Sequence, residues 1–224
     1  EFRGVTRALA ARGACAASGM VLALLLSACA TLPTEPAPRA DALPRELAGS
    51  TALGSRVLSA TTAHGSDSGI RLLDTGRDAF LERAALIEAA ERSIDAQYYI
   101  WNSDATGRYM AARLYAAAGR GVRVRVLLDD INVGARDDVL ALLDQHPNIE
   151  IRIYSPALQR RGLRWALGFL REFSRLNRRM HNKSFTVDGS VTIIGGRNIG
   201  DEYFDAHATL NFRDRDVVAV GPVV

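Results

Sequence analysis

Helical and strand-like patterns alternate three times between residues 78 and 154, and this alternation limits the possible fold more than any other feature of the chain. Apolar residues recur at helical spacing over residues 78–92, 107–118 and 137–143, and runs rich in branched or aromatic residues follow at 94–101, 122–128 and 149–154. Strands joined through helices form right-handed parallel units. We therefore predict an α/β fold, with a layered, mixed and largely parallel sheet flanked by helices.

A hairpin is predicted after these elements, because Asp188-Gly189 lies between two runs of branched and aromatic residues. On a strand, residues two apart lie on the same face. We therefore expect His181 and Lys183 to point the same way, which places a nucleophile or base beside a fixed positive charge. Phosphoryl transfer can use such a pair.

The first 28 residues have the three-part layout of a secretory signal peptide. Three arginines precede an uncharged, increasingly apolar run at residues 13–26, which is followed by Ser27, Ala28 and Cys29. A helix of that length, at about 1.5 Å per residue, falls short of roughly 30 Å of hydrocarbon, so a transmembrane span is disfavoured. A buried core helix fits these flanking residues poorly.

The end of this run resembles the lipobox of bacterial lipoproteins, which implies cleavage before Cys29 and a diacylglyceryl group on its sulfur. Ala30 after the cysteine resembles lipoproteins sorted to the outer membrane of the cell envelope. Four of the seven prolines fall soon after Cys29, so residues 29–69 are expected to form a stiff tether. The folded domain is then expected to span residues 70–224.

Charge and cysteine content exclude some classes of function. Residues 1–28 hold three arginines and one glutamate, and without them the chain has 25 basic and 24 acidic residues. A near-neutral mature chain makes nucleic acid an unlikely partner. Both cysteines, Cys15 and Cys29, lie in the first thirty residues, so neither a disulfide framework nor a thiolate metal site is expected.

A basic segment at residues 159–179 carries seven arginines interleaved with leucine, phenylalanine and tryptophan. One interpretation is a surface helix with a solvated arginine face. The other is a surface that meets anionic lipid headgroups, because this segment leads directly into His181.

Lysine occurs once in the chain, at Lys183, against 27 arginines. An ammonium is a compact point charge, whereas a guanidinium is a planar fork. Retention of one lysine amid this bias is consistent with a single charge placed against a non-bridging phosphate oxygen.

The spacing H-x-K-x4-D from His181 to Asp188, followed by G-G-x-N ending at Asn198, resembles the signature of the phospholipase D superfamily and in particular its cardiolipin synthase-like branch. The segments 97–101 and 199–204 strengthen the resemblance, which covers roughly residues 70–224. It implies that the chain is one phospholipase D-type half-domain.

This resemblance also implies roles for individual residues. His181 would be the nucleophile or the general acid/base, and a phosphohistidine would divide the displacement into two steps. Lys183 would bind phosphate oxygens, Asn198 and Gly196 would contribute to substrate binding, and Asp188 would belong to the catalytic set by holding the site in order. No metal or other cofactor is implied.

Proteins of this superfamily usually place two such motifs around one cleft, whereas these 224 residues contain one. The second half-site is expected from a missing C-terminal half or from a homodimer. The apolar run at residues 216–224 favours a truncated chain, which alone would have little activity. The expected function is a phosphatidyltransferase or phospholipase acting on glycerophospholipids, with water, glycerol or phosphatidylglycerol as acceptor. The alternatives are a nucleic-acid phosphodiesterase and a non-catalytic lipid-binding lipoprotein.

Other polar residues are expected to have structural or surface roles. The histidines at 64, 146 and 207 lack comparable neighbours in the sequence. Asp129, Asp130 and Asn132 follow a core strand, where a capping or turn role competes with a role in a site. Asp201, Glu202 and Asp205 could contact a substrate alcohol, but a solvated loop is favoured.

Overall fold

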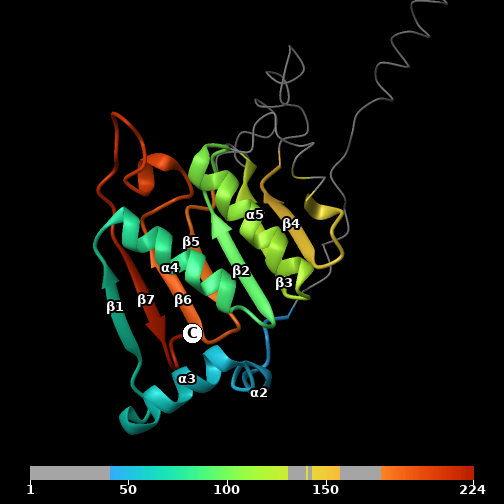
Figure 1. The fold of residues 1–224 in the computed structure, drawn as a ribbon, viewed down its shortest axis with the longest axis vertical. Helices are drawn as coiled ribbons and strands as arrows, with labels where there is room; N and C mark the ends of the chain where they lie inside the picture. The colour runs from blue at the N-terminus through green and yellow to red at the C-terminus, as the bar shows by residue number, and fades with distance from the viewer. Residues whose placement is uncertain (1–40, 131–139, 141–142, 157–177) are drawn as a thin grey trace, which may run out of the picture. The chain divides into compact units, whose positions relative to one another are not determined.

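The computed structural model describes residues 41–130, 140, 143–156 and 178–224. Within them, one mixed sheet has the strand order β1-β7-β6-β5-β2-β3-β4 (Figure 1). The strands are β1 (Gly69–Leu73), β2 (Ser93–Tyr98), β3 (Arg123–Asp129), β4 (Ile149–Tyr154), β5 (Lys183–Val187), β6 (Val191–Gly195) and β7 (Asp216–Val220). The helices are α2 (Arg45–Ala48), α3 (Ala52–Thr61), α4 (Gly76–Ala89) and α5 (Ala105–Gly119), with short 3₁₀ turns η1 (Thr62–His64) and η3 (Asp201–Tyr203).

The predicted layered α/β fold with a mixed sheet is confirmed, but parallel pairing is confined to β2, β3 and β4. The other four neighbouring pairs are antiparallel: β5 with β2, β5 with β6, β6 with β7 and β1 with β7. The predicted hairpin joins β5 to β6. Asp188 and Gly189 have φ values of 51° and 57°, as the two central residues of a type I′ turn require.

Two capped helices cover one face of the sheet (Figure 1). The side chain of Thr75 accepts a 3.0 Å hydrogen bond from the backbone N–H of Asp78 at the start of α4, and Asp104 accepts one of 2.9 Å from Gly107 at the start of α5. Both helices place a stripe of small and apolar side chains against the sheet. The core therefore lies between these helices and the alternate, inward-facing residues of the central strands.

The folded part of the chain begins before Ile70, so the structure differs from the expected tether at residues 29–69. Both α2 and α3 lie within that range, and Leu53 and Val57 of α3 pack against the core. These two residues are four apart, so they share one face of the helix, and Thr51 caps its start. One pair of core-facing apolar residues was too weak a pattern to predict this helix from the sequence.

Three other predicted features fall wholly or largely outside the described residues: the signal peptide with Cys29, the helix at 137–143 and the basic segment at 159–179. Among the helices that the structure does describe, none combines the length and apolar character needed to cross a bilayer.

Candidate active site

The predicted site residues begin where β5 starts beside the carboxyl end of β2. The two strands are antiparallel, and Tyr98 and Lys183 are partners in the register. The residues just beyond this pair, Tyr99 and His181, therefore meet at the edge of the sheet, where their ring centroids are 4.9 Å apart. The carboxyl ends of the parallel strands β2 and β3 lie at the same edge, which is where open α/β sheets place ligand sites.

One tyrosine ring brings the two predicted catalytic side chains together. Besides its contact with the imidazole of His181, the ring of Tyr99 lies 5.4 Å from the Nζ atom of Lys183. The same Nζ donates a 3.0 Å hydrogen bond to the backbone carbonyl of His181. His181 is exposed, so its imidazole is available to a substrate, and Asn182 beside it donates a hydrogen bond to Gln97 on β2.

Burial governs the electrostatics of Lys183, whose side chain lies largely inside the fold at 7% exposure. Desolvation lowers the pKa of the ammonium, and the nearby carboxylate of Asp214 acts in the opposite direction. A weakly hydrated ammonium at the edge of a site is well suited to bind a phosphate oxygen, because little water must be displaced from it.

Asn198 lies at the same edge of the sheet and is almost fully buried. Its side-chain oxygen accepts a 3.0 Å hydrogen bond from the backbone N–H of Ile100. The following residue, Ile199, forms a parallel bridge with Trp101, so this loop runs along the extension of β2. Tyr203 is also hydrogen-bonded to Asn198, although burial raises the pKa of that tyrosine overall. These contacts fix Asn198 close to the residues that hold His181.

Gly196 contributes a backbone hydrogen bond, and its lack of a side chain leaves room for Asp214. Its N–H donates a 3.0 Å hydrogen bond to the carbonyl of Arg215, and a Cβ atom at this position would lie 2.7 Å from Oδ1 of Asp214. Glycine therefore allows the carboxylate that acts on Lys183 to approach this loop closely.

Asp188 lies at the far end of β5 from Lys183, about 16 Å away at roughly 3.3 Å per residue. Its fully buried carboxylate accepts hydrogen bonds of 3.0, 2.8 and 2.9 Å from the backbone N–H groups of Glu91, Arg92 and Ser93. These contacts join the hairpin to the loop between α4 and β2. In the structure Asp188 therefore joins the hairpin to this loop and lies away from His181, and its role in the site stays a prediction.

Asp129 has a larger part in the site than the sequence indicated. Asp129 is the last residue of β3 and is fully buried. Its carboxylate accepts a 2.9 Å hydrogen bond from the backbone N–H of Met180 and forms a 3.2 Å ion pair with Arg179. The residues immediately before His181 are therefore anchored to the carboxyl end of a central strand. The position of Asp129 after a core strand was the only sequence signal for this role.

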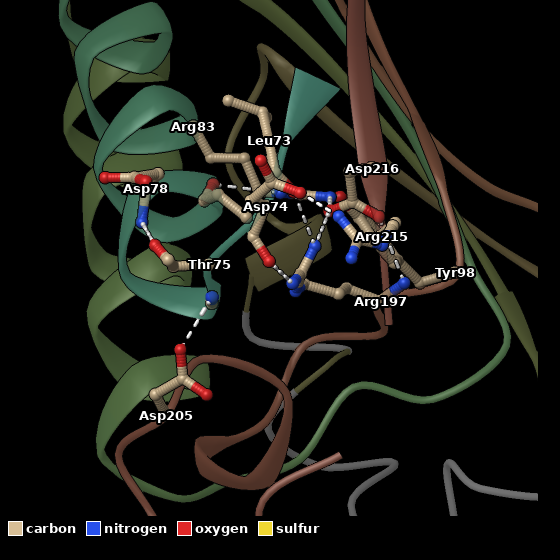
Figure 2. A network of polar contacts seen from close by, with 12 residues as sticks. Leu73, Asp74, Thr75, Asp78, Arg83, Tyr98, Arg197, Asp205, Arg215 and Asp216 are labelled. Carbon is tan, nitrogen blue, oxygen red and sulfur yellow. Dashed lines mark hydrogen bonds and ion pairs between the residues drawn. The ribbon is translucent and has the colours of Figure 1, made fainter. Parts of the chain in front are cut away.

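A buried ionic network joins α4 to residues that are next in sequence to two site residues (Figure 2). Arg83 on α4 donates hydrogen bonds of 2.9 Å to the hydroxyl of Tyr98 and to the carboxylate of Asp216. Asp216 also accepts from the backbone N–H of Arg197, whose guanidinium reaches the carbonyls of Leu73 and Asp74. Tyr98 and Arg197 each precede a site residue, Tyr99 and Asn198, so the network fixes both segments. No sequence motif predicted it.

Several of the remaining polar candidates lie elsewhere in structural contacts, and Asn132 lies outside the described residues. His146 packs against the ring of Tyr115, and His207 accepts hydrogen bonds from its own loop. Asp201 accepts from the N–H of Thr106 at the start of α5, and Asp205 from that of Gly76 at the start of α4. Within the described part of the chain, no group of three or more His, Cys, Asp or Glu side chains is placed to bind a metal ion.

Comparisons with known proteins identify the family of this chain. The family described as "Cardiolipin synthase, PLD-like domain" matches residues 84–220. The chain is 54% identical over 172 residues to cardiolipin synthase C of Escherichia coli K12, which covers 77% of this chain and 36% of that protein. It is 33% identical over 156 residues to cardiolipin synthase A of Pseudomonas putida, which covers 69% of this chain and 30% of that protein.

A solved structure shares the fold. The phosphatidylserine synthase of Haemophilus influenzae Rd KW20 superposes with a TM-score of 0.52 at 17% identity, over 68% of this chain and 33% of that one. The chain therefore spans about a third of the length of the relatives it matches. The match over residues 84–220, which contains His181, Lys183 and Asn198, shows that the chain belongs to the cardiolipin synthase-type, phospholipase D-like family.

Proposed function

We propose that this chain supplies one half-site of a phosphatidyltransferase or phospholipase that acts on glycerophospholipids. The observation that carries the proposal is the grouping of His181, Lys183 and Asn198 at one edge of the sheet, with Tyr99 in contact with the first two. The names of the relatives, cardiolipin synthases and a phosphatidylserine synthase, support a phospholipid substrate.

The proposed reaction has two displacements at phosphorus. In the first, a histidine nitrogen forms a P–N bond while the P–O bond to the leaving alcohol breaks, and a second histidine protonates that alcohol. In the second displacement, the histidine that protonated the leaving alcohol removes a proton from the acceptor, whose oxygen attacks phosphorus as the P–N bond breaks. His181 is one of these two histidines. Lys183 neutralises charge that develops on the non-bridging oxygens.

The second histidine comes from a second half-site, supplied by the remainder of a longer protein or by a second copy of this chain. The single H-x-K motif in 224 residues and the limited coverage of the relatives support this part of the proposal.

The direct test uses a longer protein that contains this chain, incubated with phosphatidylglycerol vesicles while lipid products are followed by mass spectrometry. We expect cardiolipin with released glycerol, or phosphatidic acid, from the unmodified protein and neither from a His181→Ala variant. A His64→Ala variant is the matched control, because His64 is an exposed histidine on η1. Equal turnover by both variants would overturn the proposal. Cleavage of nucleic acid with no lipid turnover would favour the phosphodiesterase alternative.

We also propose that the mature protein is anchored in the bacterial cell envelope through lipidated Cys29, at the outer membrane. The apolar run, the small residues before Cys29 and Ala30 after it support this placement. When the protein is expressed in bacteria and extracted with detergent, Cys29→Ser should move it from the detergent-rich to the aqueous phase on phase separation. Cys15→Ser should not change its distribution. An unchanged distribution in Cys29→Ser would contradict the anchor.

A further inference from the structure

An elongated apolar cavity of about 230 Å³ lies between α5 and the strands β3 and β4. Its floor is formed by Val124, Val126 and Leu128, which alternate along one face of β3, with Ile151 on the neighbouring strand. At roughly 3.3 Å per residue, the segment of β3 from Val124 to Asp129 is about 16 Å long. The cavity is therefore extended along the strands.

Small residues on α5 form the roof of this cavity. Gly107 and Ala111 are four apart, so they lie on the same face of the helix, and both line the space together with Leu114. A Cβ atom at Gly107 would meet the carbonyl oxygen of Asn102 at 1.9 Å, so this glycine is required by the backbone. Ala111 is then the position at which side-chain size sets the width of the cavity.

Two residues that line the cavity also contact residues of the candidate active site. Tyr99 and Asp129 line one end of it. Tyr99 contacts His181 and Lys183, and Asp129 holds Met180 just before His181. A molecule with its apolar part in the cavity can therefore have its polar end beside the two predicted catalytic side chains.

We propose that this cavity binds one acyl chain of the glycerophospholipid whose phosphate lies at His181 and Lys183. This inference rests on the proposed function. The lining suits an alkyl chain, because apolar cavities do not hold water well. Apolar cavities of about 150 Å³ can bind benzene, so this larger volume has room for a segment of an alkyl chain. The extended shape along β3 suits a chain better than a compact ring.

The test measures binding of a lysophospholipid in the absence of turnover. The signal is the fluorescence of Trp101, which lines the cavity. The protein is the complete 224-residue chain with Trp165→Phe, so that Trp101 is the single remaining tryptophan. The probe is lysophosphatidylglycerol with bromine atoms midway along its acyl chain, used below its micelle-forming concentration. Bromine quenches indole fluorescence only at short range. We expect saturable quenching by this lipid and none by the same lipid without bromine.

Two matched variants locate the bound chain. Ala111→Phe fills the cavity and should weaken the apparent Kd of the brominated lipid by about tenfold or more. Ala112→Phe adds the same side chain at the adjacent, exposed position of α5 and should leave the Kd unchanged. Circular dichroism confirms that each variant is folded, and the measurement on the Trp165→Phe chain stands even if Ala111→Phe does not fold.

The outcomes separate this inference from the proposed function. Absence of quenching, or equal weakening in both phenylalanine variants, would overturn the acyl site, even where a longer protein turns over phosphatidylglycerol. Quenching that is lost only in Ala111→Phe supports the site, even if no turnover is found. A brominated fatty acid that binds as tightly as the lysophospholipid would overturn the assignment to a phospholipid chain.

Discussion

The ammonium of Lys183 donates a 3.0 Å hydrogen bond to the backbone carbonyl of His181, two residues earlier in the chain. This bond ties the charge that would hold a phosphate to the backbone that carries the histidine. The ring of Tyr99 contacts both side chains, so the three groups form one unit at the edge of the sheet. A change at any one of them is therefore expected to alter the others.

Replacement of Lys183 tests whether the compact shape of its ammonium matters. Lys183→Arg keeps the charge but places a planar fork in a site where the native side chain is 7% exposed. We expect kcat of the longer protein to fall by about 10²–10³-fold, the cost typical of losing one preorganised donor. Lys183→Met should show a similar loss. Arg56→Lys, at an exposed position on α3, is the control. Retention of most activity by Lys183→Arg would contradict this account.

The pKa of Lys183 can be measured directly, because it is the only lysine in the chain. Burial lowers this pKa below that of an ordinary lysine side chain, and the carboxylate of Asp214 opposes the shift. The unfolded chain then binds more protons than the folded one between the two pKa values, so stability contributed by this group rises with pH across that window. After ¹³C-methylation of the lysine, NMR should give a lower midpoint for the folded chain than for the chain in urea.

Asp214→Asn should lower the folded midpoint further, because it removes the carboxylate that favours the charged ammonium. Asp67→Asn, at an exposed position, is the control. A folded midpoint equal to or above that of the unfolded chain would show that burial does not control this group.

Asp188 should affect stability more than any residue at the other end of β5. Asp188→Ala leaves three backbone N–H groups without their acceptor and puts alanine at a φ of 51°, so we expect a loss of about 3–5 kcal/mol in the free energy of unfolding. Asp188→Asn should lose less, because asparagine tolerates this φ and keeps one acceptor. His181→Ala, at an exposed position, should change stability by less than about 0.5 kcal/mol. Urea unfolding measures all three, and equal stabilities would contradict the ordering role.

Local patterns in the sequence predicted the elements that repeat a clear period. The helices α4 and α5 and the strands β2, β3 and β4 appear within a few residues of their predicted bounds, and Asp188-Gly189 forms the predicted turn. Strand order was not predictable in the same way. Pairing of β5 with β2, and of β1 with β7, joins residues that are about ninety and one hundred and fifty apart, and no local period encodes such contacts.

The arrangement of the candidate site residues could be predicted only in part, and their roles stay predictions. The motif identified His181, Lys183 and Asn198, which the structure brings to one edge of the sheet. It did not identify Tyr99 as their shared contact or Asp129 as the anchor of the residues before His181, because both roles depend on which strands become neighbours. The H-x-K-x4-D spacing also joins residues with different tasks, since Asp188 is separated from His181 by the length of β5.

Removal of one partner of the Arg83–Asp216 pair is expected to destabilise the fold more than removal of both partners. Their side chains are 1% and 0% exposed, and the guanidinium and carboxylate are 2.9 Å apart. Arg83→Met leaves the hydroxyl of Tyr98 and the carboxylate of Asp216 without this donor, at a cost of about 3–5 kcal/mol in the free energy of unfolding.

Asp216→Asn should cost less than Asp216→Leu, because the amide oxygen still accepts from Arg83 or Arg197. In a double-mutant cycle measured by urea unfolding, Arg83→Met with Asp216→Leu should be more stable than the sum of the single losses predicts. Additive losses would mean that the two side chains act independently, and the network would then not be what holds the segments of Tyr99 and Asn198 in place.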